Sequence, residues 1–460
     1  MGRLDCIASY SYREIIMRES GQAIAEKFLD AAKKHGATAA DVMLTQSQDS
    51  TAQCRVGKVD IVNSANSVRI GLRALVGQRV SLVSTSDITD ESIDHMAATA
   101  VEMAKVMPED PQAGLLEPQQ IKQQELDLVD HSSVDFAKLT DMAMAADQAG
   151  NSVKGVKSAE DCSATAAKSR TILLNTNGLA HNYESTSFSI VARMVAADDS
   201  GMETDYMYSV ATHVDDLLPA AEVGQMAGEY AAKRLSAGPS PTGQVPVVLS
   251  QRVARGLLQS FAAAISGDSV VKKLSFMKDS MDQKVFNENI TIVDDPFKKR
   301  GLRSKLVDVE GIVPQKQNIV KNGRLQSWLL DSKSAKKLQL PSTGHAHRGV
   351  GSHASPAPTN LTLLPGESSP TDLMSDIKSG VYITSLMGHG INMVSGDYSR
   401  GAAGFLIENG QLTRPFSEGT IAGNLRDMFL HSTPANDLCR HEGIDVPTVR
   451  IDGMTVAGRV

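Results

Sequence analysis

Residues 67–86 read SVRIGLRALVGQRVSLVSTS, and apolar and polar side chains alternate along both halves of this stretch. Alternation with a period of two is typical of a β-strand that has one buried face. Gly77 and Gln78 interrupt the alternation where a tight turn would join two strands, and residues 41–64 alternate in the same way around Gly57 and Lys58. Short alternating runs joined by glycine turns predict an antiparallel meander rather than a parallel sheet.

Helical patterns flank this meander. Residues 20–35 repeat apolar side chains at helical spacing, and a second helix is expected to begin at Asp87 or Thr89 and to end before Pro108. Further helices are expected over 133–148 and 215–235, and residues 155–214 return to strand-like alternation. The sequence therefore predicts an α+β fold in which helices pack on an antiparallel sheet.

The chain has 460 residues, which is too long for one ordinary core, so we expect two domains. Gly, Pro and Ser crowd into residues 236–244 between two periodic segments. We therefore expect an N-terminal extension over 1–19, an N-terminal α+β domain over 20–236, and a C-terminal domain over 244–460 that is mostly antiparallel β with a few helices. Asn322-Gly323 and Asn409-Gly410 predict hairpin turns within the last of these.

Composition excludes several classes of function. The net charge is −7 and aromatic residues make up 4%, which argues against direct nucleic-acid binding because that needs basic surfaces and stacking rings. No run approaches the ~20 apolar residues of a membrane span. The four cysteines are far apart and form no CxxC motif, so we expect reduced thiols in a cytoplasmic protein.

Residues 388–405, GHGINMVSGDYSRGAAGF, contain five glycines and look like a ligand-binding loop. The last glycine of a dinucleotide fingerprint is missing, and no Lys-Ser or Lys-Thr follows Gly401 as a phosphate loop would need. Asp397 stands where a nucleophile elbow around Ser399 requires glycine. We therefore interpret the stretch as a loop whose glycines permit tight turns and close backbone contacts.

The metal and acid–base motifs are also incomplete. His345, His347 and His353 lie in a Gly/Ser/Pro-rich segment without Asp, Glu or Cys, which favours a flexible surface loop over a metal site. The HEGID stretch at 441–445 lacks the second His of a zincin helix. The carboxylates at positions 294, 295, 308 and 310 are expected to cap turns or to bind backbone amides, with no neighbouring His to complete a mechanism.

Longer stretches carry a family resemblance. Residues 380–429, GVYITSLMGHGINMVSGDYSRGAAGFLIENGQLTRPFSEGTIAGNLRDMF, resemble the PmbA (TldE) branch of the TldD/PmbA family, as do GLRSKLVDVEGI at 301–312 and PTVRIDGMTVAG at 447–458. The resemblance covers nearly the whole chain from about residue 20. It implies a cytoplasmic protein whose TldD-type and PmbA-type subunits pair into a heterodimeric metallopeptidase that trims unfolded or modified peptides.

The resemblance also implies where zinc should be bound. In the TldD branch a helix carries H-E-x-x-x-H and a later Cys completes the zinc site; the corresponding positions here are Gln259, Ser260 and Ala264, with Cys439 near the place of the Cys. Gln and Ala supply no imidazole, and Ser supplies no carboxylate base. We therefore expect no metal in this chain and zinc in a TldD-type partner. An apolar stripe should pack the helix instead, formed by Val253, Leu257, Leu258, Phe261 and Ile265.

The leading hypothesis is a non-catalytic subunit that closes a shared chamber and holds extended peptide substrates. Residues 388–405 could pair with a peptide as an added strand, with its termini or side chains recognised by His389, Asp397, Tyr398 and Arg400. In isolation, a homodimer through the same surface is a further expectation. Two alternatives stay open: an autonomous metallopeptidase whose His345, His347 and Cys439 gather in space, and a regulatory binding protein of the DNA gyrase pathway.

Overall fold

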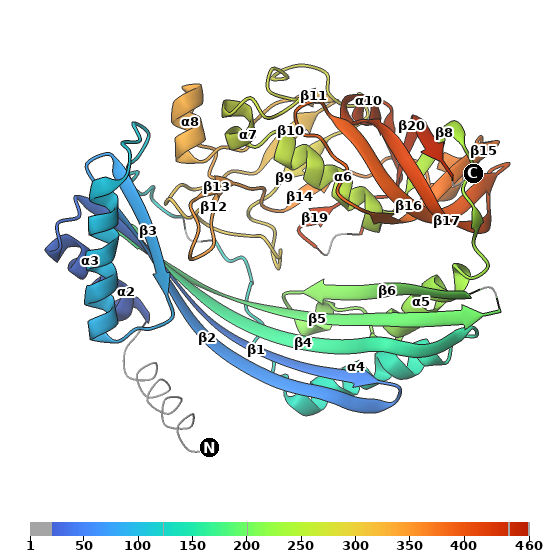
Figure 1. Ribbon diagram of the computed structural model, residues 1–460, viewed down its shortest axis with the longest axis horizontal. Helices are drawn as coiled ribbons and strands as arrows, with labels where there is room; N and C mark the ends of the chain where they lie inside the picture. Colours follow the sequence, from blue (N-terminus) through green and yellow to red (C-terminus); the bar gives the residue numbers. More distant parts are fainter. Residues whose placement is uncertain (1–20, 123, 200, 440–441, 459–460) are drawn as a thin grey trace.

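The computed structural model describes residues 21–122, 124–199, 201–439 and 442–458. The expected extension at 1–19 lies outside the described residues. A long curved sheet occupies the N-terminal half, and a more globular β-rich half lies over its concave side (Figure 1). The α+β class predicted from the sequence is confirmed.

The first sheet is an antiparallel meander with the order β3-β2-β1-β4-β5-β6. Its strands are β1 (Ala39–Arg55), β2 (Lys58–Val76), β3 (Arg79–Thr85), β4 (Val156–Asn175), β5 (Ala180–Asp198) and β6 (Gly201–Ala211). The turn at Gly77-Gln78 is confirmed. The other turn is formed by Val56 and Gly57, one residue earlier than predicted, and both have positive φ.

A carboxylate from a distant helix explains this shift. Asp147 accepts hydrogen bonds from the backbone amides of Val56 at 3.0 Å and of Gly57 at 2.6 Å. A β-branched residue at positive φ is strained, so these two bonds hold a conformation that Val56 would otherwise avoid.

In the described part of the chain, helices α2 (Gly21–Lys34), α3 (Asp90–Val106), α4 (Phe136–Asn151) and α5 (Ala220–Lys233) cover one face of the sheet. Thr89 caps α3 by accepting a hydrogen bond from the amide of Ser92, as the sequence predicted. The helices bury alternate residues of the strands, such as Val42, Leu44 and Ala52 of β1. The intervening residues face the concave side, and many of them are Ser or Thr.

Two connecting segments contact the C-terminal half. Residues 108–135 follow the C-terminal half, where the Gln119 amide donates to the Gly311 carbonyl and the Arg300 amide donates to that of Leu126. The chain passes to the second half through residues 236–244, the stretch interpreted as a domain boundary. That stretch also contributes β7 (Gly238–Pro239), which pairs with a strand of the C-terminal half.

Five strands of the C-terminal half form a closed ring: β8 (Gly243–Leu249), β15 (Ser379–Met387), β16 (Asp397–Glu408), β17 (Gln411–Asn424) and β20 (Val449–Ala457). The ring closes because β20 pairs with both β8 and β17. The short strand β18 (Ser432–Pro434) also pairs with β20. Asn409 and Gly410, at φ 50° and 79°, form the predicted hairpin turn between β16 and β17.

A smaller sheet has the order β11-β10-β9-β14-β19, formed by β9 (Ile292–Asp294), β10 (Gln317–Lys321), β11 (Arg324–Leu325), β14 (Leu361–Leu363) and β19 (Ile444–Asp445). Asn322-Gly323 turns between β10 and β11, as predicted. A separate hairpin joins β12 (Ala346–His347) and β13 (Ser355–Pro356). The helices of this half are α6 (Gln251–Ala264), α7 (Gly267–Val271), α8 (Ser332–Leu338), α9 (Pro370–Met374) and α10 (Leu425–Leu430).

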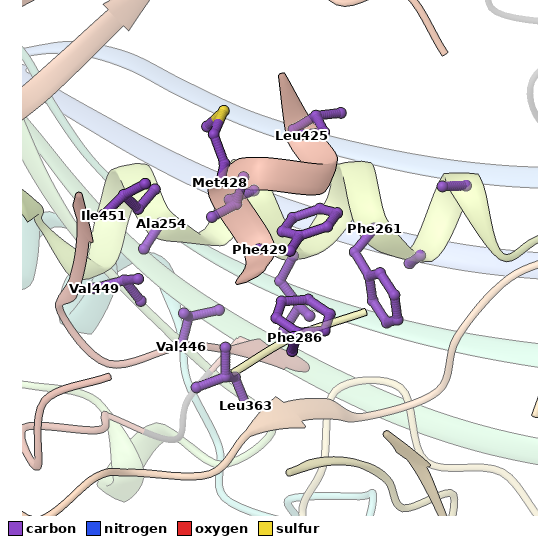
Figure 2. Close-up of a cluster of buried hydrophobic side chains, with 14 of the residues drawn as sticks. Ala254, Phe261, Phe286, Leu363, Leu425, Met428, Phe429, Val446, Val449 and Ile451 are labelled. Atoms are coloured by element: carbon purple, nitrogen blue, oxygen red, sulfur yellow. The ribbon is translucent and has the colours of Figure 1, made fainter. Parts of the chain in front are cut away.

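Helix α6 lies in the centre of the C-terminal core. Phe261 of α6, Phe429 of α10 and Phe286 pack together, with ring centroids between 4.6 and 5.6 Å apart (Figure 2). The expected apolar stripe of α6 is confirmed, because all five of its residues are buried. Burying aromatic side chains of this size is a large stabilising contribution, so α6 is a structural element of the core.

The loop between β12 and β13 ties the two halves together. Arg348 donates to the Asp41 carboxylate of β1 at 2.5 Å, and Arg73 of β2 donates to the same carboxylate. The carbonyl oxygen of Val350 would lie only 1.9 Å from a Cβ on Gly71. Position 71 must therefore be glycine for the loop to lie this close to β2.

Candidate functional site

The three α6 residues that the family resemblance assigned to the zinc motif lie in three different environments. Gln259 is exposed, Ala264 is fully buried, and Ser260 donates its hydroxyl hydrogen to the Gly256 carbonyl of its own helix at 2.8 Å. Neither an exposed amide nor a buried methyl group is a zinc ligand, and the Ser260 hydroxyl is occupied. These residues do not fit a zinc ion.

Cys439 is exposed and follows Asp437, whose carboxylate accepts a hydrogen bond from Gln251 at the start of α6. Within the described ranges, no three His, Cys, Asp or Glu side chains are grouped so that they could hold a metal ion. In particular, the gathering of His345, His347 and Cys439 that an autonomous metallopeptidase would need does not occur there.

The glycine-rich stretch is only partly a loop, which corrects the sequence interpretation. Residues 388–396 connect β15 to β16, and β16 begins at Asp397. A Cβ on Gly390 would lie 1.8 Å from the Ser399 carbonyl oxygen, and one on Gly404 would lie 1.9 Å from that of Tyr382. The prediction that these glycines permit close backbone contacts is confirmed.

The four candidate residues of this stretch do not converge. His389 and Asp397 are exposed, and Asp397 accepts hydrogen bonds from Ser395 at 2.6 Å and from Asn424 at 3.3 Å. Tyr398 is buried on the opposite face, where burial raises the pKa of its hydroxyl and the nearby Arg400 partly opposes that rise. The structure therefore brings Tyr398 and Arg400 together and leaves His389 and Asp397 at the surface.

Both backbone edges of β16 are already paired at these residues. Ser399 donates to the Gly390 carbonyl at 2.7 Å and Asn392 donates to that of Asp397 at 2.8 Å, while β17 occupies the other edge. A peptide therefore cannot join the sheet as a strand here. What remains of the hypothesis is recognition by the exposed side chains.

His345 corrects the expectation of a flexible surface loop. It is fully buried, with its Nε2 3.1 Å from Asp294 Oδ2 and its Nδ1 2.8 Å from Thr343 Oγ1. The expectation that no His lies beside Asp294 is therefore wrong. The order Thr–His–Asp resembles a catalytic triad, but Thr343 Oγ1 also accepts the Leu330 amide at 2.8 Å and His345 has no contact with solvent. We therefore interpret these buried hydrogen bonds as structural rather than catalytic.

The remaining carboxylates behave as predicted. Asp308 accepts hydrogen bonds from the amides of Glu310 and Ile312 at 2.9 Å each and from that of Ala346 at 3.1 Å. Glu310 accepts the amide and hydroxyl of Ser332. Burial raises the pKa of both carboxyl groups. They organise backbone turns near the contact between the halves.

A polar pocket of about 930 Å³ lies between the first sheet and residues 349–352. Its walls come from β1, β2, β3 and the loop between β12 and β13. Most of the lining residues carry hydroxyl groups, among them Thr45, Ser47, Ser67 and Ser84, and one is Arg69. Sequence reasoning missed this pocket because its parts are far apart in the chain. The one available signal was the repetition of Ser and Thr on one face of β1 and β2.

Three family models match the chain: PmbA/TldA metallopeptidase domain 1 over residues 40–104, the central domain over 129–235 and the C-terminal domain over 242–458. Together they cover most of its length.

The chain belongs to the PmbA/TldD family.

Curated relatives place it on the PmbA branch of that family. It is 31% identical to the metalloprotease PmbA homolog of Haemophilus influenzae, over 94% of each chain. It is also 31% identical to metalloprotease PmbA of Escherichia coli O157:H7, over 91% of this chain and 92% of that one. A TldD homolog of H. influenzae matches 55% of this chain at 28% identity.

Solved structures share the PmbA/TldD fold. A candidate modulator of DNA gyrase from Bacteroides thetaiotaomicron superposes with a TM-score of 0.87 at 22% identity, over 96% of this chain and all of that one. TldE from Thermococcus kodakarensis superposes with a TM-score of 0.84 at 19% identity, over 95% of this chain and all of that one. No helix among the described residues is long and apolar enough to cross a membrane.

Proposed function

We propose that this chain is the non-catalytic subunit of a heterodimeric peptidase in the cytoplasm and that it holds extended peptides for a zinc-bearing TldD-type partner. The observation that carries the proposal is the chemistry of α6, where Gln259, Ser260 and Ala264 occupy the positions that the resemblance assigns to the zinc motif. None of them can replace an imidazole ligand or a carboxylate base. The family membership supports peptides as the substrate class.

The concave face of the first sheet supports the peptide-holding role. Hydroxyl groups line up across its strands: Ser47 and Ser67 are joined at 2.8 Å, Ser169 and Ser185 at 2.9 Å. Hydroxyls both donate and accept hydrogen bonds, so such a surface can satisfy the backbone of peptides of varied sequence. The buried, unpaired Cys54 and Cys162 are in keeping with a reducing compartment.

A reconstitution experiment tests the proposal. The purified chain, a TldD-type subunit and their mixture are each assayed for zinc content and for cleavage of an unfolded peptide. We expect the chain alone to hold no stoichiometric zinc and to cleave nothing, and the mixture to be active. Stoichiometric zinc with cleavage by the chain alone would replace this proposal with an autonomous metallopeptidase.

A matched variant sharpens the test. The exposed Asp397 and the partly buried Arg400 remain candidates for contact with the peptide or the partner. D397A and R400A are expected to raise the KM of the mixture without changing the fold of the chain. K33A, at an exposed position near the end of α2, is the control and should leave the KM unchanged. Wild-type kinetics in both test variants would remove these residues from the proposed surface.

A further inference from the structure

The polar pocket between the first sheet and residues 349–352 has one charged wall residue. Among the described residues that line it, Arg69 alone carries a charge, and no carboxylate is present. The Arg69 side chain is exposed and makes no hydrogen bond or ion pair with any residue in the described part of the chain. An unpaired guanidinium in a hollow surrounded by hydroxyl groups favours an anionic ligand.

The hydroxyl groups suit an oxyanion joined to a peptide. Ser67 precedes Arg69 on the same face of β2, with Thr45 and Ser47 on the neighbouring strand. These groups can donate to carboxylate oxygens and accept from peptide amides. No aromatic ring lies among the described lining residues, so the pocket offers no stacking surface for a base or a sugar.

The backbone beside the pocket offers a free strand edge. Strand β3 pairs with β2 only over Ile70–Val76, so the outer edge of residues 58–69 has no strand partner in the described structure. Alternate residues of an unpaired edge direct their N–H and C=O groups outward, which is the template for strand addition. Val59 and Ile61, about half exposed at 49% and 47%, provide apolar contact farther along this edge.

The loop that forms the wall opposite the sheet keeps the pocket in shape. The loop of residues 349–352 lies against β2 at Gly71, and Arg348 fixes the start of the loop through Asp41. Within the loop, the amide of Gly349 donates to Ser352 Oγ at 2.9 Å. A pre-formed site of this volume lies in the range of ligand-binding pockets.

We propose that this pocket binds the carboxylate end of an extended peptide, with the Arg69 guanidinium as its anchor and the free edge of β2 as its strand partner. The proposal takes the substrate class from the proposed function and adds which end of the peptide is recognised and where. It requires neither metal nor cleavage, so it can be tested on this chain alone.

The test measures binding by fluorescence anisotropy with the full chain and no partner. The probe is an extended peptide of Ala and Ser, labelled at its N-terminus and made with either a C-terminal carboxylate or a C-terminal amide. We expect the carboxylate form to bind about fivefold more tightly, the gain typical of one charge-assisted contact at an accessible site. Equal affinity of the two forms, or no binding of either, would overturn the proposal.

Variants assign the preference to Arg69. R69A should abolish the difference between carboxylate and amide, whereas R69K should keep part of it because Lys retains the charge without the planar fork. R55A removes another exposed arginine of the same hairpin and should preserve the difference. S67Y should occlude the pocket and weaken both peptides. A carboxylate preference that persists in R69A would place recognition elsewhere and refute the assignment.

Two further arms separate the remaining outcomes. Competition with inorganic phosphate and with acetate distinguishes the anions, and displacement by phosphate at a much lower concentration than by acetate would make this a phosphate site and overturn the proposal. Reconstituted peptidase activity is measured separately. Inactive mixtures with an intact, Arg69-dependent carboxylate preference would refute the proposed function alone, and active mixtures without that preference would refute this inference alone.

Discussion

At the residue scale, Ala264 and Gln259 show how differently two positions of one core helix are placed. Ala264 is fully buried and carries a small apolar side chain, whereas Gln259 is exposed and carries a polar one. A small apolar side chain suits packing in the core and a polar one suits contact with solvent, and neither is a metal ligand.

This difference makes the two positions respond differently to histidine. A264H inserts a larger polar ring into a fully buried site, so we expect a loss of stability of about 1–3 kcal/mol. Q259H is the matched control at an exposed position and should change stability by less than about 0.5 kcal/mol. Chemical denaturation followed by circular dichroism measures both. An unchanged midpoint in A264H would show that the site has room for an imidazole.

The buried hydrogen bonds that Asp294 accepts are a second residue-scale feature. D294A leaves His345 and Thr359 without their shared acceptor, and we expect it to cost about 3–5 kcal/mol. D295A, at the adjacent residue, removes a partly exposed ion pair with Lys316 and one hydrogen bond from the Phe297 amide, and should cost less than about 2 kcal/mol. Similar denaturation midpoints for the two variants would contradict the structural role assigned to Asp294.

At the element scale, the connector of residues 108–135 is held by Asp130. Its carboxylate accepts the amides of Val214 and Ser132 at 2.8 Å each and the hydroxyl of Ser132. Burial alone would raise the pKa of Asp130, but these hydrogen bonds outweigh it and lower that pKa to about 2. These hydrogen bonds therefore stabilise the connector most strongly when Asp130 is ionised.

A pH dependence follows from this lowered pKa. A carboxyl group whose folded pKa lies below its unfolded value adds stability above the unfolded pKa and loses it as the pH falls through the folded one. We expect the Asp130 contribution to disappear between about pH 4 and pH 2. D130N should be less stable at pH 7 and lose less stability over that acid range, as measured by thermal denaturation, whereas D141N on exposed α4 should follow the wild type. If the stability of D130N and of the wild type fell in parallel as the pH was lowered, the role assigned to Asp130 would be refuted.

Local signals in the sequence predicted most elements, and distant pairings explain the rest. Asn409-Gly410 and the Thr89 cap act within a few residues, so their structures followed from the sequence alone. The Val56 turn depends on Asp147, which lies about ninety residues away in the chain, and His345 meets Asp294 across another long separation. Local sequence patterns carry no information about contacts between residues that are far apart in the chain. The pocket around Arg69 could not be predicted for the same reason.

At the scale of the whole molecule, the two halves meet through many polar contacts and an apolar cluster around Met43 and Val350. Arg252 of α6 lies 4.5 Å from the centre of the Tyr206 ring in β6, and Tyr208 donates to Glu442 at 2.6 Å. With the Arg348–Asp41 contact, these fix the β-rich half over the concave face (Figure 1). The arrangement keeps the hydroxyl-bearing face of the sheet turned toward the second half.

The free edge of β2 has a consequence for self-association. Val59, Ile61 and Val62 are all about half exposed beside an unpaired strand edge, which is a template for pairing with another chain. We expect the isolated protein to self-associate at high concentration and the V59K/I61K variant to do so less, as measured by sedimentation velocity. V106K, at a highly exposed position on α3, is the control. An identical oligomer distribution in V59K/I61K would exclude this edge as the contact.

The closed ring of β8, β15, β16, β17 and β20 also imposes an order on folding during synthesis. Strand β8 precedes the other four in the chain, yet it needs β20, which follows all of them, as its antiparallel partner. On the ribosome, the nascent ring therefore stays open with unpaired edges until β20 has emerged. Slow translation downstream of β17 should leave this half dependent on chaperones, whereas the meander before it can already be complete.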